Sequence, residues 1–193
     1  MNSGATAPEW FTPVAASSDC VRLATIDNAG SGTPAYVDMQ SVFSATYDFY
    51  ELYGTDIEFS TDTLIEVSFL VGSTEQTGTY YRKQQFLYGN TATSSAQNEA
   101  GTNTDGFHPW GNWNQGTSQT INGGVKMTFL DPYSSLTYPS AYWSVNCHQS
   151  AQMIGGTGFG YMGTNIAADG IRIKPATGNF ASGRFNLYGF KAS

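Results

Sequence analysis

Hydrophobic and polar residues alternate along much of the chain, and a period of two is the pattern of a strand with one buried face. The strongest case is residues 63–71, where Val67 and Phe69 alternate with Glu66 and Ser68. Leucines also occur on the second face of this stretch, so we expect it to be covered on both sides. Residues 63–71 are therefore predicted to form an interior strand of a sheet.

Similar short runs recur through the sequence, separated by residues that favour turns, such as Gly, Ser, Asn and Pro. They predict about ten strands, at residues 20–26, 36–39, 47–53, 63–71, 79–88, 118–121, 125–130, 141–148, 158–163, 170–174 and 183–190. Helix is expected only as a short turn near residues 40–43. Because no βαβ spacing occurs, the predicted fold is all-β, an antiparallel β-sandwich of the jelly-roll type.

The last two strands are expected to close the fold as a β-hairpin. Residues 170–174 and 183–190 both show the period of two, and the residues between them include Pro175 and Gly178. Proline and glycine are typical of turns between paired strands. The sequence therefore predicts that 170–174 pairs antiparallel with 183–190.

The composition agrees with a single β domain. Charged residues make up 12% of the 193 residues, while the chain holds 22 Gly, 12 Tyr, 12 Phe and 4 Trp, a mixture that suits short strands and tight turns. A chain of this length is commonly one β domain. Residues 1–18 contain two prolines and several small residues without periodicity, so they are predicted to be a linker to one domain at residues 19–193.

The charge of the chain limits its partners. The formal net charge is −7, with eight Lys and Arg residues in all, so the basic patch that nucleic acid requires is not expected. No apolar run approaches the length of a membrane span, and the first residues lack the pattern of a secretory signal. We expect a soluble, non-secreted chain with no nucleic-acid partner and no membrane insertion.

Two short segments resemble a known group of proteins. The ending, with Gly170-Ile-Arg-Ile and Gly183-Arg-Phe-Asn-Leu-Tyr-Gly-Phe, is similar to the C-terminal strand pair of β-sandwich domains in bacteriophage virion proteins, mostly tail fibres and related adhesins. The opening, Met1-Asn-Ser-Gly-Ala-Thr-Ala-Pro8-Glu-Trp10, resembles the linker that joins such tip domains to a fibre shaft in marine phages. The resemblance is confined to these two ends, and neither motif is catalytic.

This resemblance implies a virion structural protein, assembled in the host bacterial cytoplasm, with a tail-fibre-like tip that attaches to a host-surface glycan. It implies a homotrimer that also contacts other virion proteins. The alternative is a capsid decoration or cement protein that stabilises the virion without binding a receptor. Residues 47–53 carry aromatics on both faces, and Phe159 and Tyr161 alternate with Gly, so we expect one of these surfaces between subunits.

The two cysteines are expected to stay reduced. Cys20 and Cys147 lie in strand-like runs and are interpreted as core-facing positions. A protein assembled in bacterial cytoplasm meets reducing conditions. No disulfide between them is therefore predicted.

The sharpest binding candidate lies in a long polar stretch, residues 89–116, for which no regular structure is expected. Loops of this length in compact domains commonly have a function. Residues 105–115 combine two Trp with Asp, Asn, Gln and His, and indole rings stack on sugars while the polar groups bind hydroxyls. The predicted ligand-binding residues are Asp105, His108, Trp110, Asn112, Trp113 and Asn114. The alternative is that the two Trp are packing residues or face another subunit.

No metal, cofactor or catalytic site is predicted. His108 and His148 are the only histidines, and neither belongs to a metal-binding spacing. Asp105 is the acid that most suggests hydrolysis, and Glu99 is a distant second. The sequence contains no nucleophile-elbow motif. The protein is therefore not expected to be an enzyme.

Overall fold

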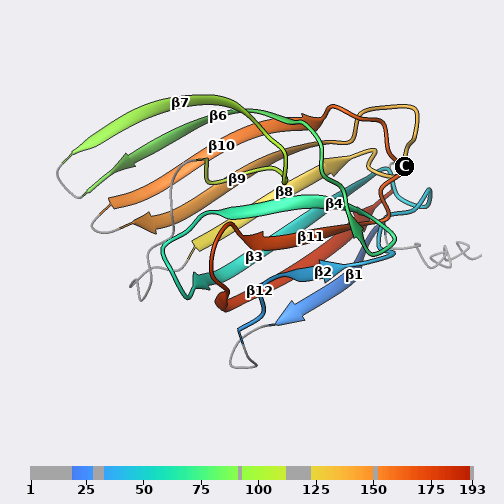
Figure 1. Ribbon diagram of the computed structural model, residues 1–193, viewed down its shortest axis with the longest axis horizontal. Helices are drawn as coiled ribbons and strands as arrows, with labels where there is room; N and C mark the ends of the chain where they lie inside the picture. The colour runs from blue at the N-terminus through green and yellow to red at the C-terminus, as the bar shows by residue number, and fades with distance from the viewer. Residues whose placement is uncertain (1–18, 28–32, 91–92, 112–122, 150–151, 192–193) are drawn as a thin grey trace, which may run out of the picture.

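The computed structural model describes residues 19–27, 33–90, 93–111, 123–149 and 152–191. This part of the chain forms twelve strands and no helix. The strands build two antiparallel sheets that face each other as a sandwich (Figure 1). The predicted all-β fold is confirmed, while the expected linker at 1–18 and the expected strand at 118–121 lie outside the described residues.

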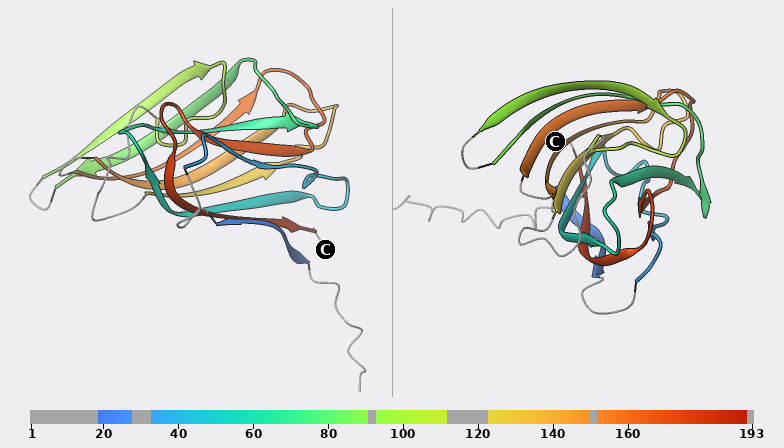
Figure 2. Two further views of the ribbon diagram at one scale, coloured as in Figure 1. Left: turned by 60° about the horizontal axis from the view of Figure 1, so that its bottom comes forward. Right: turned by 60° about the vertical axis from the view of Figure 1, so that its left-hand side comes forward.

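The two sheets differ in size. The larger one has the order β1 (Cys20–Asp27), β12 (Phe180–Phe190), β3 (Phe49–Phe59), β8 (Gly123–Leu130), β9 (Ser140–Gln149), β10 (Gln152–Met162), β6 (Tyr80–Gly89) and β7 (Ser94–Asn103). The smaller one has the order β2 (Val37–Met39), β11 (Gly170–Pro175), β4 (Ile65–Val71) and β5 (Thr74–Glu75). The smaller sheet lies across one face of the larger, and β6 and β7 extend beyond it (Figures 1 and 2).

The core lies between the sheets and follows from the alternation along the strands. Leu52 on β3 and Phe185 and Leu187 on β12 point into it and are fully buried. Each such side chain contributes about 1.5–3 kcal/mol by leaving water. β4 lies between β11 and β5, and the first six of its seven residues are buried. The prediction of an interior strand here is confirmed.

The expected closing hairpin is wrong. β11 pairs with β2 and β4 in the smaller sheet, whereas β12 pairs with β1 and β3 in the larger sheet. The chain crosses between the sheets through a turn in which Gly178 has φ 76° and the Phe180 amide donates to the Pro34 carbonyl at 3.0 Å. A period of two specifies which face of a strand is buried, but not which strand lies beside it. The two strands therefore meet in one core without sharing an edge.

Part of the stretch that is expected to lack regular structure is in fact a strand. β7 pairs with β6 residue by residue, from Ser94 opposite Gly89 to Asn103 opposite Tyr80. Its side chains are small or polar and mostly exposed, so no hydrophobic period reveals it in the sequence. β7 is an edge strand, which needs one backbone partner and tolerates polar side chains.

The expected helical turn at residues 40–43 does not form. Ser41 has a positive φ of 54°. The amides of Val42 and Phe43 both donate to the Asp169 carbonyl, at 2.8 and 3.0 Å, and this places the Phe43 ring in the core. A contact distant in sequence, not local helix propensity, decides the conformation of this turn.

The two cysteines have different surroundings. Cys147 on β9 is buried, as expected, and its burial raises the pKa of the thiol to about 12. Cys20 at the start of β1 is exposed, so the expectation that it faces the core is wrong. Its register opposite Phe190 places it on the side of the larger sheet that is turned away from the smaller sheet. No disulfide joins the two residues, as predicted.

Candidate functional site

The predicted ligand-binding residues do not form one exposed site. Asp105 and His108 are neighbours, with Asp105 Oδ1 3.2 Å from His108 Nε2. Trp110 is fully buried, and its Nε1 donates to the Gly124 carbonyl at 3.3 Å. The other three residues, Asn112, Trp113 and Asn114, lie outside the described residues, so their role stays a prediction.

Trp110 is a packing residue. The expectation that its ring stacks on a sugar is therefore wrong, and the alternative that it packs within the protein is correct for this residue. Its ring lies 5.6 Å from that of Phe59. Phe107, in the same segment, is also buried and exchanges two backbone hydrogen bonds with Val67, at 2.8 and 2.9 Å. The buried side chains of Phe107 and Trp110 therefore form a plug that fills the core between β4 and the larger sheet. They do not extend into solvent.

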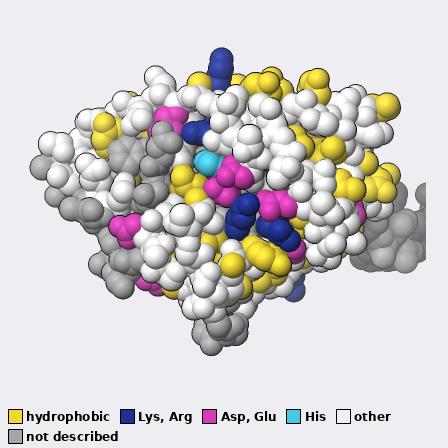
Figure 3. Space-filling model, in the orientation of Figure 1, with side chains coloured by type: hydrophobic (Ala, Val, Ile, Leu, Met, Phe, Trp, Pro, Cys, Tyr) yellow, Lys and Arg dark blue, Asp and Glu magenta, His cyan; other side chains and the backbone are white. Residues whose placement is uncertain are grey.

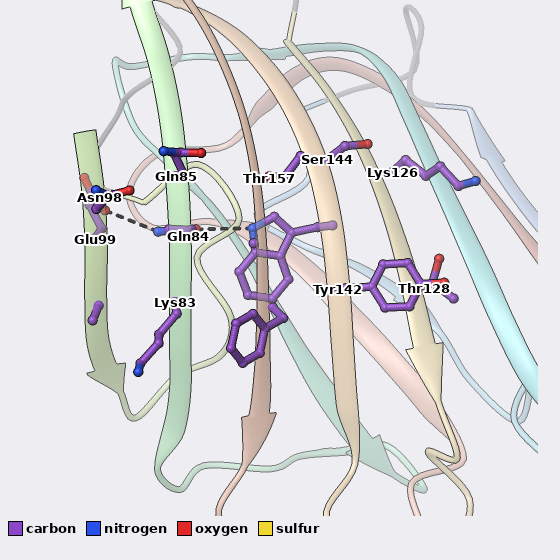
Figure 4. Close-up of a pocket in the computed structure, with 14 residues that line it drawn as sticks. Lys83, Gln84, Gln85, Asn98, Glu99, Lys126, Thr128, Tyr142, Ser144 and Thr157 are labelled. Atoms are coloured by element: carbon purple, nitrogen blue, oxygen red, sulfur yellow. Dashed lines mark hydrogen bonds between the residues drawn. The ribbon is translucent and has the colours of Figure 1, made fainter. Parts of the chain in front are cut away.

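A groove crosses the outer face of the larger sheet, which is the face turned away from the smaller sheet (Figure 4). Its volume is about 850 Å³, within the roughly 300–1,000 Å³ that is usual for small-molecule sites. Five adjacent strands line it: β8, β9, β10, β6 and β7. Since alternate residues of each strand point outward, the register of the ladder arranges these side chains in rows across the sheet.

One of these rows is aromatic and the next is polar. Tyr142 of β9 lies opposite Phe159 of β10, which lies opposite Lys83 of β6. The side chains of Tyr142 and Phe159 are 49% and 56% exposed. The polar row, from β8 to β7, consists of Lys126, Ser144, Thr157, Gln85 and Asn98. An exposed aromatic surface thus borders a line of amine, hydroxyl and amide groups.

The aromatic surface continues into an adjoining hollow of about 570 Å³, which shares Lys83 and Phe159 with the groove. Tyr81 and Tyr161 line this hollow and stack on each other, with ring centroids 4.8 Å apart. Tyr138 stacks in turn on Tyr161, at 5.8 Å. The binding surface is therefore elongated rather than confined to one cavity.

The floor of the groove is the glycine-rich backbone of β10, supported from below by side chains of the core. A Cβ atom at Gly158 would lie 2.6 Å from Trp143 Nε1 and 2.6 Å from Gln84 Cβ. Trp143 Nε1 donates to Gln84 Oε1 at 3.2 Å, and Gln84 Nε2 donates to Glu99 Oε2 at 3.2 Å (Figure 4). These bonds tie β9, β6 and β7 together beneath the groove, so its shape is set by the fold.

The sequence marks this site only in part. Phe159 and Tyr161 stand out because they alternate with glycines, although the pattern indicates an interface between subunits as readily as a binding site. Lys83, Tyr142 and Asn98 lie far apart in the sequence, and only the strand order β9-β10-β6-β7 brings them together. A sequence pattern does not report that order.

A second polar site, here termed the charged cluster, lies on the outer face of the smaller sheet (Figure 3). It consists of Asp38, Glu66, Glu75, Asp105, His108, Arg172 and Lys174. Arg172 binds Asp38 through two nitrogens, at 2.7 and 2.8 Å, and donates to Glu75 at 3.2 Å. Lys174 donates to Glu75 at 2.7 Å. Cross-strand ion pairs of this kind stabilise neighbouring strands.

Glu66 and His108 are the most enclosed members of the charged cluster, with side chains 6% and 13% exposed. Burial, with Asp105 nearby, raises the pKa of Glu66 to about 7. Burial also lowers the pKa of His108, so its imidazole is neutral at pH 7. The sequence pattern does not single out Glu66, because it occurs as one polar residue in a strand and lies far from Asp105 in the chain.

Comparisons with known proteins found no match. No protein-family model matches the chain, and neither a curated protein nor a solved structure does. Among the described residues there is no helix whose length and apolar character would let it cross a membrane.

Proposed function

We propose that this protein is a non-enzymatic attachment protein of a bacteriophage virion, whose tail-fibre-like tip domain binds a host-surface glycan in the groove. The observation that carries the glycan proposal is the exposed aromatic row beside the polar row. The C–H faces of sugar rings pack on Tyr and Phe rings, and sugar hydroxyls bond to amide, hydroxyl and amine groups. The groove supplies both kinds of contact side by side.

The virion assignment rests on a different observation, the resemblance of the two ends of the chain to phage fibre tips. The residues that carry the closing part of that resemblance lie in β11 and β12, which are not paired with each other. Glycan attachment needs neither a cofactor nor bond cleavage. In a homotrimer three grooves act together, and linked weak sites can raise the overall affinity by about 10² or more without any new contact.

The experiment that tests the proposal compares glycan binding and host-cell adsorption of single variants. Phe159→Ala and Tyr142→Ala each remove one aromatic ring from the groove. We expect each to weaken binding by about tenfold or more, because a lost contact of about 1.4 kcal/mol changes affinity tenfold. Urea denaturation of each variant verifies that the fold remains.

Tyr133→Ala is the matched control, since Tyr133 is 45% exposed but does not line the groove. This variant should bind like the unaltered protein. If Phe159→Ala and Tyr142→Ala fold normally and bind glycan as well as Tyr133→Ala does, the groove is not the attachment site.

The same face of the larger sheet also favours one other function, a capsid decoration or cement role. Leu87 and Met153 are 64% and 51% exposed, and apolar side chains gathered on one face are typical of protein interfaces. A Leu87→Ser variant separates the two functions. If it binds glycan normally but no longer enters the virion, the decoration role is favoured.

A further inference from the structure

Three side chains with metal-binding atoms meet where β4 faces the segment that follows β7. Glu66 lies on β4, and Asp105 and His108 lie in that segment. One ligand atom from each residue lies within 4.8 Å of the other two. Glu66 is buried, and the other two residues are partly buried. The group is therefore partly enclosed, with Glu66 in the interior and the Asp105 side chain 45% exposed.

The separations of the three groups suit a small tetrahedral ion. His108 Nε2 lies 3.2 Å from Asp105 Oδ1 and 3.5 Å from Glu66 Oε1. When zinc is bound tetrahedrally at about 2.0–2.1 Å, neighbouring ligand atoms are roughly 3.3 Å apart. One imidazole with two carboxylates is also a donor set that zinc accepts.

The charge around these side chains favours a cation. With its carboxylates ionised, the charged cluster holds four negative groups, and Arg172 and Lys174 supply two positive ones. Arg82, which lies nearby, is paired with Glu99 at 3.9 Å, so these two residues together do not change the net charge around the charged cluster. A bound cation requires its carboxylate ligands to be ionised, and the charged cluster then holds two more negative than positive groups.

The backbone and Lys174 hold the three side chains in place. Lys174 Nζ lies 3.6 Å from Glu66 Oε2, while the other oxygen, Oε1, faces His108. Lys174 itself is bound more closely to Glu75, at 2.7 Å. Val67 and Phe107 exchange two backbone hydrogen bonds between the same two segments. Ligands that are oriented by such neighbours bind a metal with little rearrangement.

We propose that Glu66, Asp105 and His108 bind one divalent transition-metal ion of the zinc class, with a fourth position left for water. The ion ties β4 to residues 105–108, and thereby holds the plug formed by Phe107 and Trp110 in the sandwich. The site is separate from the glycan-binding groove, and its function is structural. It does not depend on the proposed attachment role.

Titration of chelator-treated protein with zinc chloride tests the site. We expect one zinc ion per chain and a higher melting temperature, because a ligand that binds only the folded state stabilises it. Glu66→Gln and His108→Ala should each lower the zinc affinity by about tenfold or more and reduce the increase in melting temperature at the same zinc concentration. Anomalous scattering at the zinc edge should place the ion among the three side chains. Zinc that leaves the melting temperature unchanged overturns the proposal.

Two control variants distinguish ligation from general attraction. His148→Ala removes the other histidine and should retain zinc binding. Asp38→Asn removes one negative charge from the charged cluster at a residue that binds Arg172 and not Lys174 or a proposed ligand, so its zinc affinity should stay within a few-fold of the unaltered value. If Asp38→Asn weakens zinc binding as much as Glu66→Gln does, the ion responds only to local charge, and the proposed site is wrong. If Glu66→Gln does not fold, Asp105→Asn decides, because the Asp105 side chain is 45% exposed.

Discussion

Individual aromatic residues have two distinct roles in this protein, and burial separates them. Trp110 is fully buried and stabilises the core, whereas Phe159 is 56% exposed in the groove. The sequence draws attention to both, but it favours Trp110 as the ligand-binding residue. In a segment without periodicity, the sequence does not indicate whether a tryptophan side chain faces the core or solvent. Phe159, in contrast, follows the period of two along β10. The position of Phe159 is thus predictable at this scale, and that of Trp110 is not.

The two thiols should differ in reactivity. Cys20 is exposed, and Cys147 is buried with a pKa raised to about 12. Because the thiolate is the reactive form, an alkylating reagent at pH 8 should modify one cysteine per chain in the folded protein and two after denaturation. Mass spectrometry measures both numbers, and Cys20→Ser should show no modification in the folded state. Two reactive thiols in the folded protein, or none after denaturation without reductant, would contradict the structure.

Secondary-structure elements are predictable where burial is one-sided. The pattern of β6 or β12 identifies each as a strand, because one face meets the core and the period of two shows this in the sequence. β7 shows no such pattern, since its side chains are small or polar and its pairing with β6 is made by the backbone ladder, which requires no hydrophobic period. The sequence pattern also does not predict the sheet to which β11 or β12 belongs, because pairing depends on strand order and not on periodicity.

The glycines of β10 should differ in their tolerance of a methyl group. A Cβ atom at Gly158 would meet Trp143 Nε1 and Gln84 Cβ at 2.6 Å, so Gly158→Ala should lower the free energy of unfolding by about 1–3 kcal/mol. At Gly155 the nearest atom is the Val145 carbonyl oxygen, 3.8 Å away. Gly155→Ala should therefore be neutral or stabilising by up to about 1 kcal/mol. Urea denaturation compares the two, and equal effects would show that the core beneath the groove yields to the added methyl group.

At the scale of the whole molecule, the outer face of the larger sheet carries a group of exposed large hydrophobic residues, among them Leu87, Tyr142 and Phe159. Residues 47–53 show why the sequence predicts an aromatic excess. Tyr50 is buried in the core, while Phe49 and Tyr53 lie on the outer face and contact Phe190 and Tyr188, with ring centroids 4.8 and 5.8 Å apart. The all-β sandwich is predictable from alternation and composition. The groove is not, because it depends on which five strands become neighbours.

We predict that the protein is a homotrimer that uses this outer aromatic surface near β3 and β12. Partly exposed aromatics in a group are commonly covered by a symmetric interface. Light scattering after size-exclusion chromatography should give three times the chain mass of 20.8 kDa, and Phe49→Asp should shift the mass toward that of one chain. A single-chain mass for the unaltered protein at micromolar concentration would contradict the trimer.

The position of β12 constrains the order in which this protein can fold. β12 lies between β1 and β3 in the larger sheet, so that Cys20 is opposite Phe190 at one edge of the strand and Phe49 is opposite the same residue at the other. On the ribosome β1 and β3 emerge first, and neither can take its place beside β12 until nearly the whole domain has been synthesised. Pairings between segments so distant in sequence slow folding. The nascent chain therefore carries open strand edges and uncovered apolar faces until its last strand is released, and chaperones have the whole of that interval in which to bind them.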